Sequence, residues 1–276
     1  MGATIKSRIF LVGCPRSGTT LLQSLLAAHS DIQSFPETHF FSHLYPATQS
    51  KRRKLGLAAP AVKEHLKKTL QTMGKSDLIQ LVSPASFFCF QYINAYIKIL
   101  DQITLQSKKS FWLEKTPKHL HYVNQIESAV PNCKFLHIVR DGVDVIKSLY
   151  AVTRQFPQSW DGPWTLEKCT DRWINDYRLT MRCATSDRHL IVHYQNLVED
   201  TVLALEKIFE FIEVPFEVGV LEDYRKVCSS LILTEEVWKN QVQSNIENIP
   251  KRKAYTLSKE EEDYVVRRLK SLTLDN

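Results

Sequence analysis

The chain has 276 residues, 43% of them hydrophobic, so it can bury one sizeable α/β core, and its length alone permits one domain or two. Its six cysteines are widely scattered and include no CxxC pair, which argues against a zinc site or a disulfide framework and fits a reducing compartment. The formal net charge of +6 favours anionic ligands, but the basic residues form no single long run, so nucleic acid is not an expected partner.

The N-terminal region predicts a strand, a turn and a helix in succession. Four apolar residues, Ile9 to Val12, are typical of a short buried strand, and four leucines between positions 21 and 26 repeat at helical spacing. The turn between them holds Gly13, Pro15 and Gly18, which a regular element would not tolerate. Backbone N–H groups of such a turn and of the helix start face one concavity that favours an anion, and three hydroxyls add donors: Ser17, Thr19 and Thr20.

The spacing from Gly13 to Gly18 matches the first part of a Walker A motif, but Thr19 stands where nucleotidases place their lysine. A loop built for ATP hydrolysis would be expected to have that lysine. Here the fixed positive charge is Arg16, whose planar fork suits a phosphate or a sulfate. The pattern therefore predicts a loop for a dianion with chemistry other than ATP hydrolysis, and a plain turn between strand and helix is the alternative interpretation.

The run Pro15 to Thr20 (PRSGTT) behind an apolar strand resembles the 5′-phosphosulfate loop of the sulfotransferases that use 3′-phosphoadenosine 5′-phosphosulfate (PAPS). It is similar to the carbohydrate and tyrosylprotein branches, since the cytosolic aryl branch usually carries Lys in place of Arg16. This resemblance implies that Arg16 also stabilises the transferring group. It further implies a nucleotide-binding role for the whole loop, which comprises Cys14, Pro15, Arg16, Ser17, Gly18, Thr19 and Thr20.

Residues 31–41 (DIQSFPETHFF) predict a short strand and a turn, in which Glu37 follows a proline and precedes an aromatic pair. A carboxylate there could act as general base for an acceptor hydroxyl, a role worth about 10²–10⁴ in rate. A solvated loop residue or a helix cap is the alternative. Because Glu37 to Phe41 (ETHFF) resembles the Glu-x-His-Phe-Phe stretch of carbohydrate sulfotransferases, the resemblance implies that Glu37 is the base.

Residues 45–108 carry no nucleotide motif and are mostly helical in pattern, so we expect a helical insertion that shapes the acceptor pocket. Two stretches, Ala59 to Met73 and Ser86 to Leu105, predict its main helices, with the aromatic residues in the core. The uncharged stretch Leu78 to Ile97 is too polar to span a bilayer. The basic cluster Lys51 to Lys54 favours a solvated helix end over an acceptor-docking patch.

Phe111 to Pro117 (FWLEKTP) predicts a short strand that ends in a charged turn before a helix. Pro117 suits a first helical turn, which places Lys115 at the carboxyl edge of the sheet, where open α/β sheets bind ligands. A surface lysine is the alternative. The stretch resembles the Glu-Lys-Thr-Pro of carbohydrate sulfotransferases, which implies that Lys115 neutralises charge on the transferring sulfuryl group and its leaving phosphate. The aryl branch has a histidine where this chain has Pro117, so Glu37 is the expected base and His119 the fallback.

A second nucleotide motif is expected after the buried strand Lys134 to Val139. Arg140 follows that strand, and Ser148 lies eight residues on, slightly more than two helical turns, so both can face one pocket. A salt-bridged turn and a surface serine are the alternatives. The matching residues of the family hold the 3′-phosphate of PAPS, and Tyr194, after the strand Leu190 to His193, resembles a tyrosine that approaches the adenine.

Later segments complete the expectations from the sequence. Thr153 to Pro163 predicts a loop that could act as a lid, and a long helix is expected from Leu166 to Arg188. Near the C-terminus, a basic run precedes a helix capped by Ser258. Related enzymes close over the nucleotide with a basic C-terminal loop, so the resemblance implies that this run binds the nucleotide through Lys251, Arg252 and Lys253.

Together these patterns predict an α/β fold in one domain over residues 1–276, with a P-loop-like, mostly parallel sheet flanked by helices and the helical insertion. The expected reaction moves a sulfuryl group from PAPS to a hydroxyl or amine of an acceptor and releases PAP, with no metal. The acceptor stays open among a small molecule, a glycan, a lipid and a peptide, and a homodimer is compatible. No signal peptide and no membrane span are visible, which predicts a soluble cytoplasmic enzyme. Sulfotransferases of the secretory pathway normally carry an N-terminal membrane anchor, so the resemblance implies either an enzyme of bacterial type or a shortened form of an anchored one. A P-loop small-molecule kinase and a catalytically silent PAP-binding protein are the alternatives.

Overall fold

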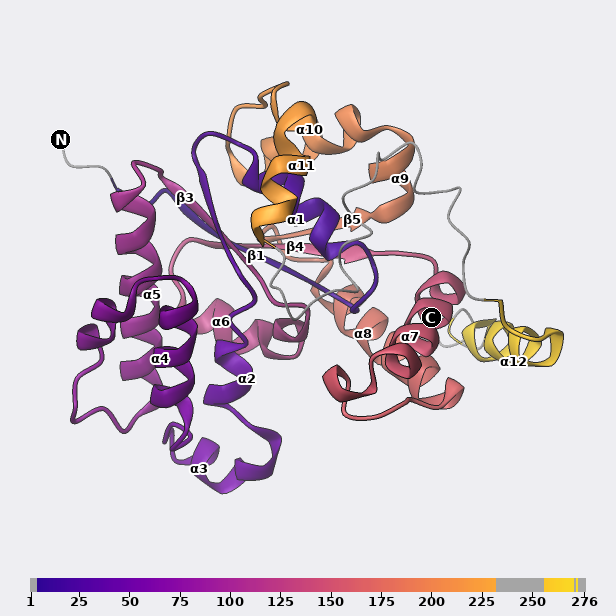
Figure 1. The fold of residues 1–276 in the computed structure, drawn as a ribbon, viewed down its shortest axis with the longest axis horizontal. Helices are drawn as coiled ribbons and strands as arrows, with labels where there is room; N and C mark the ends of the chain where they lie inside the picture. Colours follow the sequence, from indigo (N-terminus) through magenta and orange to yellow (C-terminus); the bar gives the residue numbers. More distant parts are fainter. Residues whose placement is uncertain (1–3, 232–255, 271, 273–276) are drawn as a thin grey trace.

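The computed structural model describes residues 4–231, 256–270 and 272. In these residues one sheet has the strand order β2-β3-β1-β4-β5, and every neighbouring pair is parallel (Figure 1). The strands are β1 (Ser7–Gly13), β2 (Ile32–Phe35), β3 (Phe111–Lys115), β4 (Cys133–Val139) and β5 (His189–His193). The expected α/β architecture with a mostly parallel sheet is therefore confirmed.

The central strand β1 decides which loops meet. Its Leu11 aligns with Lys115 of β3 on one side and with Leu136 of β4 on the other. The inner strands are nearly continuous apolar runs, as expected for a parallel sheet that is buried on both faces. Because all the strands run in one direction, the loops that follow Gly13, Lys115 and Val139 lie at the same edge of the sheet.

Helices cover both faces of the sheet (Figure 1). Alternate residues of the strands point to opposite faces, so Leu11 and Leu136 pack under one set of helices. Phe10 and Phe135 pack on the other face, where their rings stack 5.5 Å apart. The first face is covered by α1 (Thr19–Ala27), α9 (Tyr194–Glu199), α10 (Thr201–Ile212) and α11 (Val220–Leu231). The second face carries α6 (Val123–Ala129) and the insertion, and a third apolar cluster joins α7 (Gly142–Gln155), α8 (Leu166–Cys183) and α12 (Lys259–Lys270).

The connection between β2 and β3 contains the expected helical insertion. Its longest helix, α5 (Cys89–Gln106), begins and ends within three residues of the predicted stretch, and α4 (Val62–Thr72) matches the other prediction. The connection also holds α2 (Phe40–Leu44), α3 (Ser50–Lys54) and the short 3₁₀ helices η1 (Ala47–Gln49) and η2 (Ser76–Leu81). Among the described residues, no helix is both long enough and apolar enough to cross a membrane.

Two expectations for later segments were only partly right. The predicted loop from residue 153 is helical at first, because α7 continues to Gln155 and the 3₁₀ turn η4 (Pro157–Ser159) follows. In the remainder, Trp160 and Trp164 pack edge to face with their ring centroids 5.7 Å apart. Helix α8 ends at Cys183, five residues before the predicted end, because the chain must turn before β5 can pair with β4.

Candidate active site

The loop between β1 and α1 has the backbone that its glycines predict. Gly13, Arg16 and Gly18 have φ angles of 151°, 74° and 100°, in the region that favours glycine. A side chain at Gly18 would overlap the ring of Tyr194, so this position has no room for another residue. Helix α1 begins at Thr19 without a side-chain cap, so no side chain competes with an anion for the N–H groups of its first turn.

Arg16 joins this loop to the second predicted motif. Its Nε donates a hydrogen bond to Ser148 Oγ at 3.0 Å, across 132 residues of sequence. Ser148 lies in α7, which follows β4, so the contact links the loops at the ends of β1 and β4. The two predicted motifs therefore lie next to each other. A nucleotide with phosphates on the 3′ and the 5′ position of its ribose would require this.

Arg140 and Tyr194 form the opposite side of this region. The Arg140 guanidinium lies over the Tyr194 ring, 4.6 Å from the ring centroid, and donates to Asp144 Oδ2 at 2.9 Å. Arg140 Nε is buried and has no hydrogen-bond partner among the described residues. The Tyr194 ring also packs against Gly18. The residues predicted to bind the 5′-phosphosulfate and those predicted to bind the 3′-phosphate and the adenine therefore surround the same region.

The other residues of the loop are mostly buried. Ser17 Oγ is buried and has no hydrogen-bond partner among the described residues, so it could donate to a ligand. Burial, followed by the nearby Asp176, raises the pKa of the Cys14 thiol well above its usual range, which makes this cysteine a neutral packing residue. Thr19 and Thr20 are buried at the start of α1, and Pro15 is half-buried.

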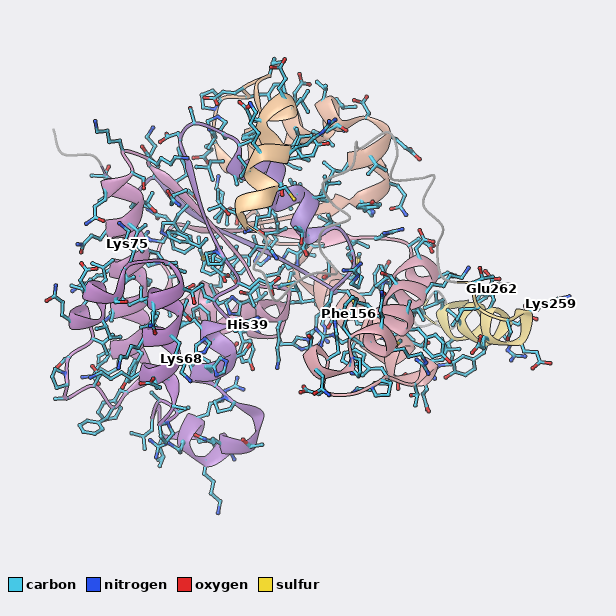
Figure 2. The ribbon with its side chains drawn as sticks, viewed as in Figure 1. His39, Lys68, Lys75, Phe156, Lys259 and Glu262 are labelled. Atoms are coloured by element: carbon cyan, nitrogen blue, oxygen red, sulfur yellow. The ribbon has the colours of Figure 1, made fainter. Side chains whose placement is uncertain are left out.

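Glu37 and Lys115 form an ion pair at the same edge of the sheet. Lys115 Nζ donates to Glu37 Oε1 at 2.5 Å, and the lysine side chain is only 2% exposed. His39 Nε2 lies 3.4 Å from the other carboxylate oxygen of Glu37. Figure 2 shows His39 between the insertion and the sheet. The structure thus brings together the carboxylate and the lysine that the sequence picked out separately.

A buried carboxylate, Glu114, holds the Glu37 loop against β3. It accepts hydrogen bonds from Thr38 N–H at 3.2 Å, from Thr38 Oγ1 at 2.9 Å and from Thr116 Oγ1 at 2.5 Å. Its second oxygen accepts from His119 Nδ1 at 2.9 Å. Burial alone would raise the pKa of the Glu114 carboxyl, but the His119 ring and the hydroxyls of Thr116 and Thr38 outweigh it and lower that pKa. Glu114 is therefore an ionised hydrogen-bond acceptor that fixes the residues on both sides of Lys115.

His119 uses both ring nitrogens within this network. Its Nε2 accepts from the Phe41 backbone N–H at 3.3 Å, so the ring proton is on Nδ1, which faces Glu114. The side chain is completely buried. This arrangement favours a role in positioning the loop from Glu37 to Phe41, and it leaves the fallback role of His119 as base a prediction.

The insertion reaches the Glu37 loop through a pair of histidines. His65 of α4 donates from Nε2 to the Thr38 carbonyl at 2.6 Å, and its ring stacks on His43 of α2 at a centroid distance of 3.5 Å. Burial, with a smaller contribution from His65, lowers the pKa of His43 to about 4. Both rings are consequently neutral at pH 7, and the insertion is fixed to the Glu37 loop by an uncharged contact.

The predicted C-terminal nucleotide contacts Lys251, Arg252 and Lys253 lie outside the described residues. The helix that follows them, α12, is anchored on α7. Lys147 pairs with Glu262 at 2.8 Å, and Tyr150 donates to Glu261 at 3.1 Å.

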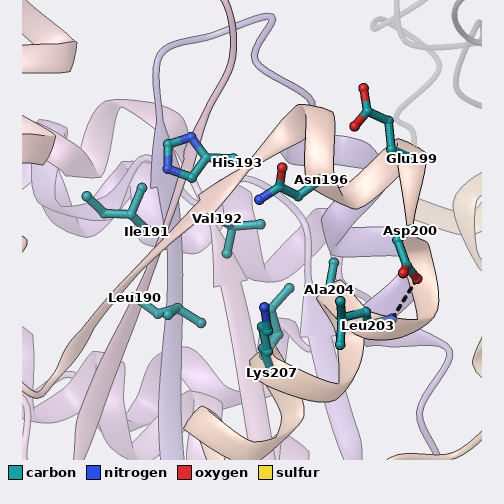
Figure 3. A pocket seen from close by; sticks show the side chains of 11 residues that line it. Leu190, Ile191, Val192, His193, Asn196, Glu199, Asp200, Leu203, Ala204 and Lys207 are labelled. Atoms are coloured by element: carbon teal, nitrogen blue, oxygen red, sulfur yellow. Dashed lines mark hydrogen bonds between the residues drawn. The ribbon is translucent and has the colours of Figure 1, made fainter.

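A separate pocket of about 270 Å³ lies along β5, α9 and α10 (Figure 3). It is lined by apolar side chains of β5 and α10 and by five polar or charged residues: His193, Asn196, Glu199, Asp200 and Lys207. None of the predicted catalytic residues lines it. The candidate active site therefore lies at the loops that follow β1, β3 and β4.

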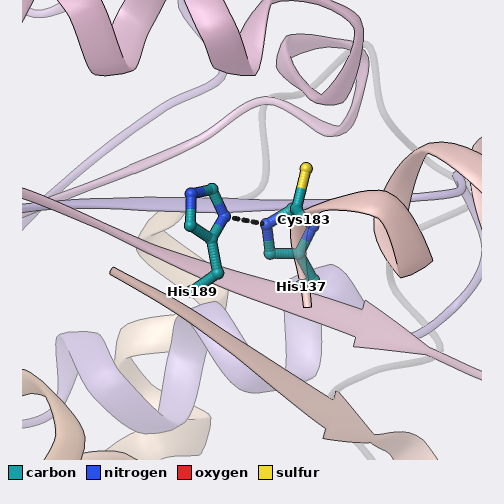
Figure 4. A group of neighbouring side chains, drawn as sticks. All are labelled: His137, Cys183 and His189. Atoms are coloured by element: carbon teal, nitrogen blue, oxygen red, sulfur yellow. Dashed lines mark hydrogen bonds between the residues drawn. The ribbon is translucent and has the colours of Figure 1, made fainter. Parts of the chain in front are cut away.

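One group of described residues has donor atoms close enough to hold a metal ion: His137, Cys183 and His189 (Figure 4). The two rings share a hydrogen bond of 2.8 Å between His137 Nε2 and His189 Nδ1, while His189 Nε2 donates to Glu127 at 3.3 Å. Burial, followed by the nearby His189, lowers the pKa of His137 to about 3. The hydrogen bond already uses the ring nitrogens that face each other. This cluster is therefore a neutral hydrogen-bonded group of side chains from β4, β5 and the end of α8.

Sequence reasoning missed three of the residues that position the site: Thr38, His65 and Glu114. Glu114 had a signal, because a glutamate inside an otherwise apolar strand (FWLEK) needs buried partners. Thr116, three residues before His119, was a visible candidate for one of them. His65 had no such signal, since its partner is a backbone carbonyl 27 residues away.

Comparisons with known proteins agree with this geometry. A family model described as "Sulfotransferase family" matches residues 8–218. A protein-tyrosine sulfotransferase of Drosophila melanogaster is 26% identical over 216 residues, which cover 77% of this chain and 39% of that protein. Protein-tyrosine sulfotransferase 1 of Danio rerio is 24% identical over 220 residues, which cover 77% of this chain and 55% of that protein. The chain thus spans about half or less of the length of these relatives.

Solved structures show the same fold. The sulfotransferase domain from the curacin biosynthetic pathway has a TM-score of 0.59 at 19% identity, covering 97% of this chain and 99% of that one. The sulfotransferase domain of the Synechococcus PCC 7002 olefin synthase has a TM-score of 0.58 at 20% identity, covering 97% and 95%. The family model matches most of the chain, and the loop of residues 13–20 lies at the same edge of the sheet as Glu37 and Lys115. This chain therefore belongs to the sulfotransferase family.

Proposed function

We propose that this chain transfers a sulfuryl group from PAPS to a hydroxyl or amine of an acceptor and releases PAP. The observation that carries the proposal is the ion pair between Glu37 and Lys115, at the sheet edge that also holds the anion-binding loop of residues 13–20. Transfer from a phosphate-linked donor needs a base for the proton of the acceptor and a cation for the charge on the leaving phosphate, and this edge of the sheet offers both. Membership of the sulfotransferase family supports the same reaction.

The nucleotide is proposed to lie across the loops that follow β1 and β4. Residues 14–20 would hold the 5′-phosphosulfate through backbone N–H groups, the Ser17 hydroxyl and the Arg16 guanidinium. Arg140 and Ser148 would hold the 3′-phosphate, and Tyr194 would approach the adenine. The buried, unpartnered Nε of Arg140 and Oγ of Ser17 support this placement, because each is a donor without an acceptor among the described residues. Lys251, Arg252 and Lys253 remain proposed contacts that close over the nucleotide.

In the proposed step, the acceptor oxygen attacks sulfur while the bond from sulfur to the bridging phosphate oxygen breaks. Glu37 takes the proton of the acceptor, and the phosphate of PAP leaves with the bonding electrons. Lys115 donates to Glu37 in the structure described here. We expect it to exchange this partner for the bridging oxygen as negative charge develops there, while Arg16 offsets charge on the sulfuryl oxygens.

Glu37 is a better candidate for the base than His119. Glu37 is 13% exposed and lies beside the lysine, whereas His119 is buried with both nitrogens bonded to protein groups. Because Arg16 and Lys115 supply the positive charge in this scheme, the transfer is proposed to need no metal. The acceptor, a small molecule, a glycan, a lipid or a peptide, and a homodimeric assembly also remain proposals.

Transfer of ³⁵S from labelled PAPS to a mixed panel of acceptors tests the function. The wild-type protein should label at least one acceptor class, and Glu37→Ala should bind PAP as tightly as the wild type while losing about 10²-fold or more in turnover. Glu64→Ala, which removes an exposed carboxylate of α4, is the matched control and should keep its turnover. Intact turnover in Glu37→Ala would move the base to His119. Magnesium-dependent ATP turnover, or PAP binding without transfer to any acceptor, would contradict the proposal.

A further inference from the structure

The positive charge of the chain is concentrated in the insertion, residues 45–108. This segment contains ten Lys and Arg residues and three Asp and Glu residues, a net charge of +7, whereas the whole chain has a net charge of +6. One of the three acidic residues, Asp101, is already paired with Arg8 at 2.6 Å. Figure 2 shows Lys68 and Lys75 on this part of the molecule. The insertion is therefore a basic lobe on a nearly neutral body.

The same segment exposes large apolar side chains. Phe87 is 64% exposed, Phe90 60%, Phe88 43% and Leu55 69%. Every strongly exposed aromatic side chain among the described residues is one of these three phenylalanines. Three exposed phenylalanines within four residues are unusual, because each one leaves apolar surface in water that folding normally buries. We call these four residues the aromatic patch.

Backbone contacts hold the aromatic patch together and place it beside α3. Ala58 N–H donates to the Phe87 carbonyl at 2.9 Å, and Cys89 N–H donates to the Gly56 carbonyl at 2.8 Å. The Phe88 and Phe90 rings stack with their centroids 5.9 Å apart. These bonds bring the end of α3, with Leu55, next to the start of α5.

Basic side chains border the aromatic patch. Arg52 turns inward and donates to the Ala58 carbonyl at 2.9 Å, which fixes α3 against the chain that leads to the patch. Lys51 and Lys54, on the same short helix, stay exposed to solvent. Helix α3 lies at the outer edge of the insertion, far from the sheet (Figure 1). Apolar rings and ammonium groups are therefore presented together on an outer surface.

We propose that the aromatic patch and the lysines of α3 dock this protein on the surface of an anionic lipid bilayer. Aromatic side chains are favoured at the headgroup boundary, where their rings enter the apolar layer, and Lys side chains are attracted by anionic headgroups. An amphipathic surface of this kind binds in the plane of the interface and does not require a spanning helix. The proposal concerns the insertion alone and holds whether or not the chain transfers sulfuryl groups.

The insertion that would dock on the bilayer is also in contact with the candidate active site. The insertion contacts the Glu37 loop directly, since His65 of α4 bonds the Thr38 carbonyl. An acceptor anchored in the same bilayer would then be concentrated around the protein. This consequence rests on the proposed function, whereas docking itself does not.

Flotation of the purified chain with two kinds of vesicle tests the docking. The chain should float with vesicles of phosphatidylcholine mixed with phosphatidylserine, float far less with phosphatidylcholine alone, and dissociate as salt is raised. Lys51→Ala with Lys54→Ala should weaken binding roughly 25-fold, at about fivefold for each charge. Phe87→Ser with Phe90→Ser should weaken it at least tenfold.

Matched variants separate the patch from general surface effects. Val202→Ser with Leu203→Ser removes exposed apolar side chains of α10 and should leave flotation unchanged, as should the exposed-charge variant Lys226→Ala. Circular dichroism of each variant should match that of the wild type. Absence of flotation, or equal loss in the α10 variant, would overturn the proposal. So would a wild-type dimer that the phenylalanine variant converts to monomer, or binding to poly-glutamate in place of vesicles.

Discussion

Replacing Glu114 by Gln should lower the free energy of unfolding and slow the proposed reaction, because it breaks the hydrogen-bond network around this carboxylate. The carboxylate accepts four hydrogen bonds, three on Oε1 from Thr38 and Thr116 and one on Oε2 from His119. An amide in its place has one oxygen and one NH₂, so a donor would face the N–H of His119. Moving the ring proton to Nε2 does not relieve this, because the Phe41 N–H already points at that nitrogen.

The expected loss follows from this count. One buried donor left without an acceptor costs about 1–3 kcal/mol, and the remaining bonds lose the strength that an ionised acceptor gives them. Glu114→Gln should therefore lower the free energy of unfolding by roughly 3 kcal/mol in urea titrations, with a lower Tm in calorimetry. Turnover should fall while PAP affinity stays, because the network holds the Glu37 loop and not the nucleotide loop. Glu64→Gln is the control, and an unfolding free energy equal to that of the wild type in Glu114→Gln would refute the reasoning.

Three further results are expected. Gly18→Ala should lose at least tenfold in PAP affinity by calorimetry, because its side chain would overlap the Tyr194 ring. The control Gly162→Ala, with a φ of 91° but open space around it, should lose only about 1 kcal/mol of stability. Equal PAP affinity in the two variants would contradict this reasoning. Burial lowers the pKa of His137 to about 3, so below about pH 6.5 the unfolded chain takes up a proton that the folded one does not. The unfolding free energy should then fall by about 1.4 kcal/mol per pH unit toward pH 3 for this group, and His137→Phe should flatten that slope in urea titrations, whereas an unchanged slope would exclude His137 as the cause. Turnover of labelled PAPS should survive dialysis against EDTA, and activity that a divalent metal restores would contradict the metal-free scheme.

The fold was largely predictable because its signals are local. The run Ile9 to Val12 before a glycine turn, and the apolar run Lys134 to Val139, each indicate a buried parallel strand, and both strands are present. Helix α10 runs from Thr201 to Ile212 because Asp200 caps it and the left-handed Glu213 ends it. Ends were less predictable where pairing decides them, as at Cys183, where α8 stops so that β5 can join β4.

The sequence indicates the candidate site residues one by one, but it could not indicate their contacts. The sequence indicates Glu37, Lys115 and Arg16 separately, and only the order of the strands brings the first two into contact. The bond from Arg16 to Ser148 crosses 132 residues, so no spacing rule could give it. An aromatic stripe at helical spacing usually packs in the core, and this prediction was right for Tyr92 and Tyr96. It was wrong for the exposed Phe87, Phe88 and Phe90.

We propose that one site holds a nucleotide that carries phosphates on both the 3′ and the 5′ position of its ribose. Calorimetric titration of the wild-type chain with PAP and with AMP, which lacks the 3′-phosphate, tests it most directly. PAP should bind at least tenfold more tightly than AMP, and Arg140→Ala should remove most of this difference. Equal affinity for the two nucleotides, or a preference that survives Arg140→Ala unchanged, would contradict it.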